Sequence, residues 1–205
     1  MVYQGCQDVF RTSFSIQERK KLLERFRLPE AYILNVGTIE QRKNVMLAVK
    51  AIKEVNIHLV VVGAKTAYYN DVKAYIQSHG LENKVTFLTG VSSKELAALY
   101  QSAQMFVYPS LFEGFGIPII EALYSGIPVI TSKGGCFKEA GGPASVYVDP
   151  SNEIELKEAI VNILEDEQLK QDMIVQGKQY VERFNPRYIA DSFEKIYSEL
   201  NKNLY

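Results

Sequence analysis

The chain has little cysteine, no long hydrophobic run and almost no net charge. Its two cysteines, Cys6 and Cys136, are typical of a protein from a reducing compartment, although they leave a single disulfide open. The longest apolar runs, such as residues 59–63, are far too short to cross a bilayer. No charged and then apolar leader follows Met1. We therefore expect a cytoplasmic protein, and leave open whether a longer form attaches to the inner face of a membrane.

The near-zero charge excludes one large class of partners. The 23 lysines and arginines are balanced by 24 aspartates and glutamates, whereas nucleic-acid-binding proteins usually carry a basic excess. Metal ligands are also scarce. No Asp-x-Asp pair occurs, and the two histidines, His58 and His79, lie at a predicted strand start and beside a predicted helix end. We expect no nucleic-acid partner, no metal and no cofactor.

What the 205 residues do contain is a regular alternation of short apolar runs and longer amphipathic stretches. The apolar runs are nearly continuous, which indicates strands buried on both faces of a parallel sheet. Strict alternation of strands and helices predicts an α/β fold with a Rossmann-like, doubly wound sheet. Strands are predicted at 31–37, 57–63, 84–90, 105–110, 127–132 and 144–149, and helices at 44–55, 67–80, 93–103, 118–126 and 137–141.

The two ends of the chain depart from this alternation. Residues 1–10 have strand character without a partner unit, and residues 16–26 predict a charged helix. After Pro150 the sequence is wholly helical, with a break at residues 185–186. The last apolar stripe at helical spacing consists of Ile189, Phe193, Ile196, Tyr197 and Leu200.

The segment PSLFEGFGIPIIEALYSGIPVI, residues 109–130, places Glu113 and Glu121 eight positions apart. Ligands of doubly wound sheets bind beyond the carboxyl ends of the strands, where residues 111–116 form a loop. Glycines there allow close approach of the backbone, and the following helix start offers free N–H groups to a phosphate. A carboxylate repels phosphate but accepts hydrogen bonds from sugar hydroxyls. The segment therefore favours a diphosphate with a sugar on each side, as in a nucleotide sugar.

Each glutamate also has a purely structural interpretation. Glu121 alone can complement the helix dipole, and Glu113 alone can be a solvated loop acid. The other phosphate motifs fail, because a dinucleotide fingerprint starting at Gly114 would need a third glycine at Ile119, and no P-loop occurs. The arrangement as a whole favours a binding site over these interpretations.

A second polar segment, NVGTIEQRKN at residues 35–44, joins another strand end to a helix start. Arg42 and Lys43 in this segment can neutralise a diphosphate leaving group. Both residues can also be solvated, but cations are unfavourable beside the positive end of a helix dipole. An anionic ligand is therefore the better interpretation.

Together these stretches resemble the C-terminal, donor-binding domain of family 4 retaining glycosyltransferases with the GT-B architecture. The resemblance depends mainly on residues 109–130, an E-x7-E signature. The segments VGTIEQRKN, VTFLTGVSSKELAALYQSA and VYVDP follow in family order. The resemblance implies one half of a GT-B fold, with C-terminal helices. The implied activity is metal-independent transfer of a hexose from a nucleoside diphosphate sugar to a glycan or lipid-linked acceptor.

The resemblance also implies a role for each matching position. Glu113 would face the donor sugar, Glu121 would hold the ribose hydroxyls, and Lys43 would bind the diphosphate. Many relatives carry an arginine where this chain has Thr38, and Arg42 would compensate for it. With Glu113, Lys43 and Arg42 as the catalytic group, the donor-binding positions are Glu121, Gly37, Thr38, Val91, Gly114, Phe115, Gly116 and Ile117.

The same resemblance predicts a division of the chain into three parts. They are a hinge segment with a leading helix (1–30), a nucleotide-sugar-binding domain (31–184) and a terminal helix (185–205) that would cross to a missing N-terminal domain. We therefore expect this chain alone to bind donor weakly and to transfer no sugar. A non-catalytic nucleotide-sugar-binding module and a GT-B epimerase or phosphorylase remain alternatives. A phosphorylase would need a pyridoxal lysine site, which we do not find.

Overall fold

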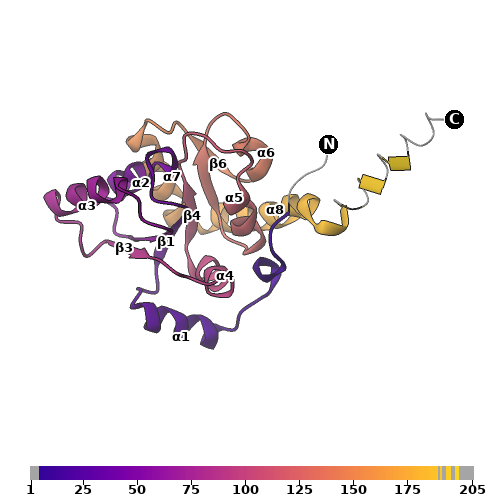
Figure 1. Cartoon of the computed structure of the whole chain (residues 1–205), viewed down its shortest axis with the longest axis horizontal. Coiled ribbons are helices and arrows are strands. Elements are labelled where there is room, and N and C mark those ends of the chain that lie inside the picture. Colours follow the sequence, from indigo (N-terminus) through magenta and orange to yellow (C-terminus); the bar gives the residue numbers. More distant parts are fainter. Residues whose placement is uncertain (1–4, 189, 191–192, 195–196, 199–205) are drawn as a thin grey trace.

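The computed structural model of the chain describes residues 5–188, 190, 193–194 and 197–198 (Figure 1). The described residues form one six-stranded, all-parallel sheet with the strand order β3-β2-β1-β4-β5-β6. This confirms the predicted doubly wound α/β fold. The strands are β1 (Tyr32–Val36), β2 (His58–Val62), β3 (Val85–Leu88), β4 (Met105–Tyr108), β5 (Val129–Ser132) and β6 (Val146–Val148).

The strand order reverses next to β1, which pairs with β2 on one side and with β4 on the other. Leu34 of β1 lies opposite Val60 of β2 and Phe106 of β4. In open α/β sheets the loops after two such strands lead to helices on opposite faces, and ligands bind outside the carboxyl ends of the strands at this point. Here these loops are residues 37–44 and 109–116, the two segments that the sequence singled out.

Helices cover both faces of the sheet, which explains why the strands are apolar throughout. Neighbouring strand residues such as Ile33 and Leu34 point to opposite faces and are both fully buried. One face packs against α2 (Val45–Ala51), α3 (Tyr68–Ser78) and α7 (Glu153–Glu165), and the other against α1 (Ile16–Phe26), α4 (Ser93–Ser102), α5 (Ile117–Tyr124) and α6 (Phe137–Gly141). Helix α8 (Glu167–Val181) adds Met173 to the first face and Val181 to the second.

Local signals set the helix ends. Ser92 begins α4 with a capping box, in which its hydroxyl accepts from the Glu95 N–H and the Glu95 carboxylate accepts from the Ser92 N–H. Gly80, just beyond α3, takes the left-handed conformation expected of a helix stop, with φ of +64°. Helix α2 ends at Ala51, four residues before the predicted end.

The predicted strand at residues 1–10 is wrong for the part that the structure describes. Asp8–Arg11 instead form a 3₁₀ turn, η1, and the Phe10 ring packs edge-on against Tyr100 with centroids 5.8 Å apart. Phe10, one of the apolar residues that gave the segment its strand character, is therefore buried against α4 and not in a sheet. The predicted helix α1 is confirmed, and it lies beside α4 at the bottom of the view (Figure 1).

The C-terminal prediction is only partly covered. After α8, Glu182–Phe184 form the 3₁₀ turn η3, and the Phe184 side chain is fully buried. Ile189, Ile196 and Leu200 of the predicted last helix lie outside the described residues. The three domain boundaries remain predictions. Within the described ranges, no helix has both the length and the apolar character needed to cross a membrane.

Candidate functional site

Two turns meet at the carboxyl ends of β1 and β4. The 3₁₀ turn η2 (Gln41–Lys43) follows β1, and its Arg42 carbonyl accepts a hydrogen bond from the Leu111 N–H at 2.8 Å. The Asn44 amide donates to the Pro109 carbonyl at 3.0 Å. Asn44 adopts a left-handed φ of +55°, which asparagine tolerates better than most residues. The backbone therefore holds the cationic turn against the loop that carries Glu113.

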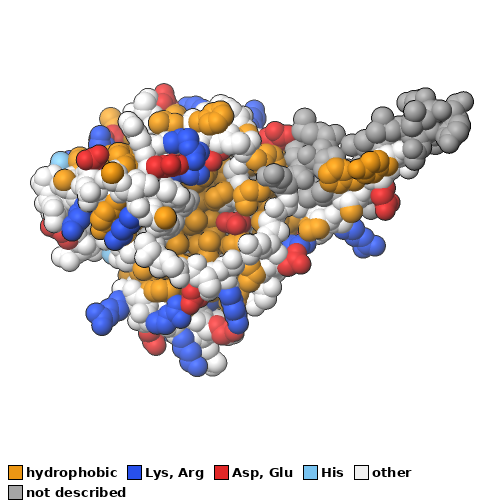
Figure 2. Space-filling model, viewed as in Figure 1, with side chains coloured by type: hydrophobic (Ala, Val, Ile, Leu, Met, Phe, Trp, Pro, Cys, Tyr) orange, Lys and Arg blue, Asp and Glu red, His pale blue; other side chains and the backbone are white. Residues whose placement is uncertain are grey.

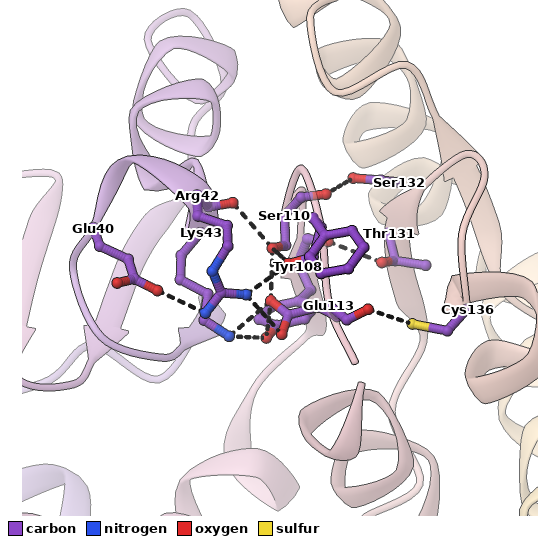
Figure 3. Close-up of polar contacts among 10 residues, drawn as sticks. Glu40, Arg42, Lys43, Tyr108, Ser110, Glu113, Thr131, Ser132 and Cys136 are labelled. Atoms are coloured by element: carbon purple, nitrogen blue, oxygen red, sulfur yellow. Dashed lines mark hydrogen bonds and ion pairs between the residues drawn. The ribbon is translucent and has the colours of Figure 1, made fainter. Parts of the chain in front are cut away.

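Glu113 lies at the centre of this contact (Figure 3). Its Oε1 accepts from Lys43 Nζ at 2.7 Å, and its Oε2 lies 3.0 Å from Arg42 Nη1. Oε1 also accepts from the hydroxyls of Tyr108 at 2.8 Å and Ser110 at 2.6 Å. Only 10% of the Glu113 side chain is exposed. Glu113 is thus a paired, largely buried carboxylate rather than a solvated loop acid.

The protonation states follow from these contacts. Burial alone would raise the pKa of Glu113, but the hydrogen bonds from Lys43, Ser110 and Tyr108 outweigh it and lower the pKa below its ordinary value. Burial and the adjacent Glu113 charge raise the pKa of Tyr108 well above its usual range. At neutral pH the site therefore holds an ionised carboxylate and a protonated phenol.

Glu121 has a very different environment on the first turns of α5. Its Oε2 accepts a hydrogen bond from the Tyr100 hydroxyl at 3.2 Å. Among the residues that the structure describes, no cation lies within ion-pair distance of it. Burial raises the pKa of Glu121 to about 7, although the Tyr100 hydrogen bond acts to lower it. Glu121 is therefore poised between its protonated and ionised forms at neutral pH.

Two glycines shape the backbone around the site. A Cβ on Gly63, at the end of β2, would lie 1.9 Å from the Gly37 carbonyl oxygen, so only glycine allows this close approach. Gly116 has a φ of +102° and directly precedes α5, whose N-terminal N–H groups lack a side-chain cap. Figure 2 shows hydrophobic side chains gathered over and around α5, with an acidic side chain among them and most charged side chains farther out.

Comparisons with known proteins agree with this geometry. A sequence profile described as "Glycosyl transferases group 1" matches residues 17–180, which is most of the chain. The chain belongs to the glycosyl transferases group 1 family. It is 39% identical over 158 residues to the O-antigen chain mannosyltransferase RfbU of Salmonella typhimurium, covering 76% of this chain and 44% of that protein.

Solved structures similar to this group 1 chain show the same fold. The Anabaena protein HepE, crystallised with UDP and glucose, has a TM-score of 0.87 at 22% identity, covering 97% of this chain and 56% of that one. The C-terminal domain of the group 1 protein LpcC from Francisella tularensis has a TM-score of 0.71 at 20% identity, covering 85% and 94%. The chain spans about half the length of the curated relatives that it matches.

The group 1 fold brings some of the predicted site residues together and separates others. Glu113, Lys43 and Arg42 form one ion-pair cluster, whereas Glu121 has a separate partner in Tyr100. The Phe115 ring packs edge-on against Phe184 with centroids 5.6 Å apart. Of the remaining predicted positions, exposed Thr38 and Gly114, partly buried Gly37 and buried Gly116 lie in the two loops. Partly buried Ile117 begins α5, and partly buried Val91 lies between β3 and α4.

The sequence analysis did not identify Tyr108 and Ser110, the two hydroxyl partners of Glu113, as site residues. Ser110 lies inside residues 109–130 and Tyr108 directly before them, and the sequence predicts both as part of the strand at 105–110. Two polar side chains directly at the carboxyl end of a buried strand were the signal that could have revealed them, because that end faces the crevice. Asn44 was missed as the residue that fastens η2 to the Glu113 loop.

Proposed function

We propose that this chain is the donor-binding half of a retaining glycosyltransferase that moves a hexose from a nucleoside diphosphate sugar to an acceptor. The observation that carries the proposal is the Arg42–Lys43 pair held against Glu113 at the point where the strand order reverses. Cations at that position suit a diphosphate, and a carboxylate between them suits the hydroxyls of the attached sugar. Family membership makes transfer the reaction class.

The leaving diphosphate needs stabilisation as the bond to the sugar breaks. Lys43 and Arg42 would supply two positive charges, and the uncapped start of α5 would supply N–H groups. These groups can neutralise the diphosphate by themselves, so we propose that no metal takes part. Retention of configuration is part of the proposal, and NMR assignment of the product anomer tests it.

The other substrate would bind elsewhere in the complete enzyme. We propose that a second domain completes the crevice and binds the acceptor, a proposal supported by relatives that are about twice as long as this chain. Similar proteins include two O-antigen chain mannosyltransferases and the Anabaena protein HepE, which was crystallised with UDP, so mannose and UDP belong among the first candidates to test. We propose that transfer requires that second domain, which a radiolabelled-donor assay on this chain and on a longer form would decide.

Nucleotide binding should not depend on a metal ion. Isothermal titration of the chain with UDP, GDP and ADP, each with and without EDTA, is expected to give one preferred base and the same affinity in both buffers. We expect a dissociation constant in the micromolar range or weaker, because one wall of the crevice would be absent and water would screen the charges. Binding that disappears with EDTA would contradict the proposal.

Neutralising Glu113 should tighten the binding of free nucleoside diphosphate. In this structure Glu113 forms ion pairs with both Arg42 and Lys43. A diphosphate must therefore compete with the Glu113 carboxylate for these two cations. Glu113→Gln removes the competing charge and should raise the affinity for the preferred diphosphate about 3- to 10-fold, corresponding to about 1 kcal/mol. The same variant should no longer bind the nucleoside diphosphate sugar in preference to the free diphosphate.

The matched control for this variant is Glu54→Gln, which neutralises a glutamate beyond the C-terminal end of α2 that is paired with Lys157 of α7. Its titration should match that of the unaltered chain. If Glu113→Gln weakened diphosphate binding instead, the cations would not be the diphosphate site.

A further inference from the structure

The two oxygens of Glu113 have different sets of partners. Oε1 accepts from three hydrogen-bond donors, namely Lys43 Nζ, the Tyr108 hydroxyl and the Ser110 hydroxyl, at 2.6–2.8 Å. Within the described part of the chain, Oε2 is paired with Arg42 alone, at 3.0 Å. An oxygen with three hydrogen-bond donors has no capacity left for a ligand, whereas Oε2 has capacity as soon as Arg42 turns away.

The hydroxyl of Tyr108 is fixed from several sides. Tyr108 ends β4 with no exposed surface, and its ring stacks on Phe106 at a centroid distance of 5.5 Å. Its carbonyl accepts from the Thr131 hydroxyl at 2.9 Å, which ties it to β5. Its phenol oxygen accepts from Lys43 at 2.7 Å while donating to Glu113. The ring and backbone of Tyr108 are therefore held by the core, and its phenol links the cation and the carboxylate.

Ser110 is fixed in a similar way. Its side chain is fully buried, and its carbonyl accepts from the Ser132 hydroxyl at 2.6 Å. The nearest acceptor for its hydroxyl is Oε1 of Glu113 at 2.6 Å. Two buried neutral hydroxyls thus reach the same carboxylate oxygen from the strand end and the loop that follows it.

We propose that Tyr108 and Ser110 are positioning residues that hold Glu113 by Oε1 and direct Oε2 toward the donor sugar. This inference rests on the proposed function. When a diphosphate binds, Arg42 and Lys43 turn toward its charge, and Glu113 loses both ionic partners. The Tyr108 and Ser110 hydroxyls stay hydrogen-bonded to Oε1, because they are neutral and the diphosphate does not draw them away. They keep the carboxylate ionised and oriented when its other contacts are gone.

The test uses Tyr108→Phe and Ser110→Ala, each of which removes one hydroxyl and little else. In each of two controls, the substitution removes a hydroxyl that also donates one hydrogen bond, but to a backbone carbonyl and not to Glu113. Tyr32→Phe removes the hydroxyl that donates to the Leu99 carbonyl at 2.6 Å, and Ser145→Ala removes the one that donates to the Gly141 carbonyl at 2.7 Å. All four variants are compared by thermal melts, so that simple loss of stability is separated from loss of positioning.

The first readout is the titration of the Glu113 carboxyl carbon by ¹³C NMR, assigned by its absence in Glu113→Gln. Loss of a hydrogen bond to the charged form should move the titration midpoint of Glu113 upward in Tyr108→Phe and Ser110→Ala, and further in the double variant. The two controls should leave it unchanged. If Tyr108→Phe does not fold, Ser110→Ala decides the question, because it removes a different donor to the same oxygen.

The second readout is the ratio of affinities for the nucleoside diphosphate sugar and the free diphosphate. We expect both variants to keep the free-diphosphate affinity within about twofold, and to lower this ratio about 5- to 10-fold as the carboxylate loses its orientation. An unchanged titration of Glu113, or an unchanged ratio, would overturn the positioning role. If the unaltered chain binds no nucleotide sugar while the midpoint still shifts, the proposed function fails, and with it the assignment of Oε2 to a sugar.

Discussion

Replacing Lys43 by methionine is expected to weaken nucleoside diphosphate binding about 10- to 100-fold. Lys43 is the less exposed of the two cations, and its Nζ lies 2.7 Å from both Glu113 Oε1 and the Tyr108 hydroxyl. A hydrogen bond between charged groups contributes about 1.5–3 kcal/mol, which sets the expected range. Methionine keeps the apolar stem that packs beside Gly37, so the backbone there should not change.

A series of ligands identifies the interaction that is lost. The effect of Lys43→Met should be large for the nucleoside diphosphate, smaller for the monophosphate and absent for the nucleoside, as measured by calorimetry or NMR line shapes. Lys157→Met is the control, because Lys157 of α7 also pairs with a glutamate, Glu54, but beyond the C-terminal end of α2. Equal losses for all three ligands would show that Lys43 supports the fold and does not contact the diphosphate.

Replacing Glu121 by glutamine is expected to stabilise the protein at pH 8 while weakening nucleotide binding. Burial raises the pKa of Glu121 to about 7 in the folded chain, from 4.5 without burial. Between these values the folded state holds a proton that the unfolded state has released, so stability falls as the pH rises from 4.5 through 7. A shift of this size corresponds to about 3 kcal/mol, or a Tm difference of about 6–12 °C.

The pH dependence of this difference is the decisive measurement. The Tm advantage of Glu121→Gln should be largest at pH 8 and should vanish below pH 4.5, where both states of the unaltered chain are protonated. Glu82→Gln, which replaces an exposed glutamate in the turn before β3, should show no such trend. A difference that stays constant with pH would mean that Glu121 ionises like an exposed carboxylate.

Folding favours the protonated form of Glu121, whereas ligand binding should favour the ionised form. If the ionised Glu121 accepts two ribose hydroxyls, as the family resemblance implies, nucleotide affinity should rise between pH 6 and pH 8 and binding should release a proton. Glu121→Gln should lose about 10- to 100-fold in affinity and the pH dependence with it. A group that destabilises the free protein and is needed by the ligand is typical of functional sites.

Much of the fold could be predicted because it depends on local patterns. The apolar strands from Tyr32 to Val148, the short α6 at Phe137–Gly141 and the charged α1 were predicted at or close to their observed bounds. Each has a signal within a few residues, such as an unbroken apolar run or a capping serine. The error at residues 1–10 arose because strand character depends on a partner, and here Phe10 packs on α4 instead.

The candidate site divides in the same way. The sequence by itself determined which groups are available: a glycine loop with two glutamates after one strand, and an arginine–lysine pair after another. Only the tertiary structure decided that Glu113 meets both cations and two hydroxyls, whereas Glu121 lies apart with a raised pKa. The reason is that charge pairing and burial depend on neighbours about 70 residues away along the chain, such as Lys43 for Glu113. The register of β1 beside β4 sets these distances, and no local pattern records it.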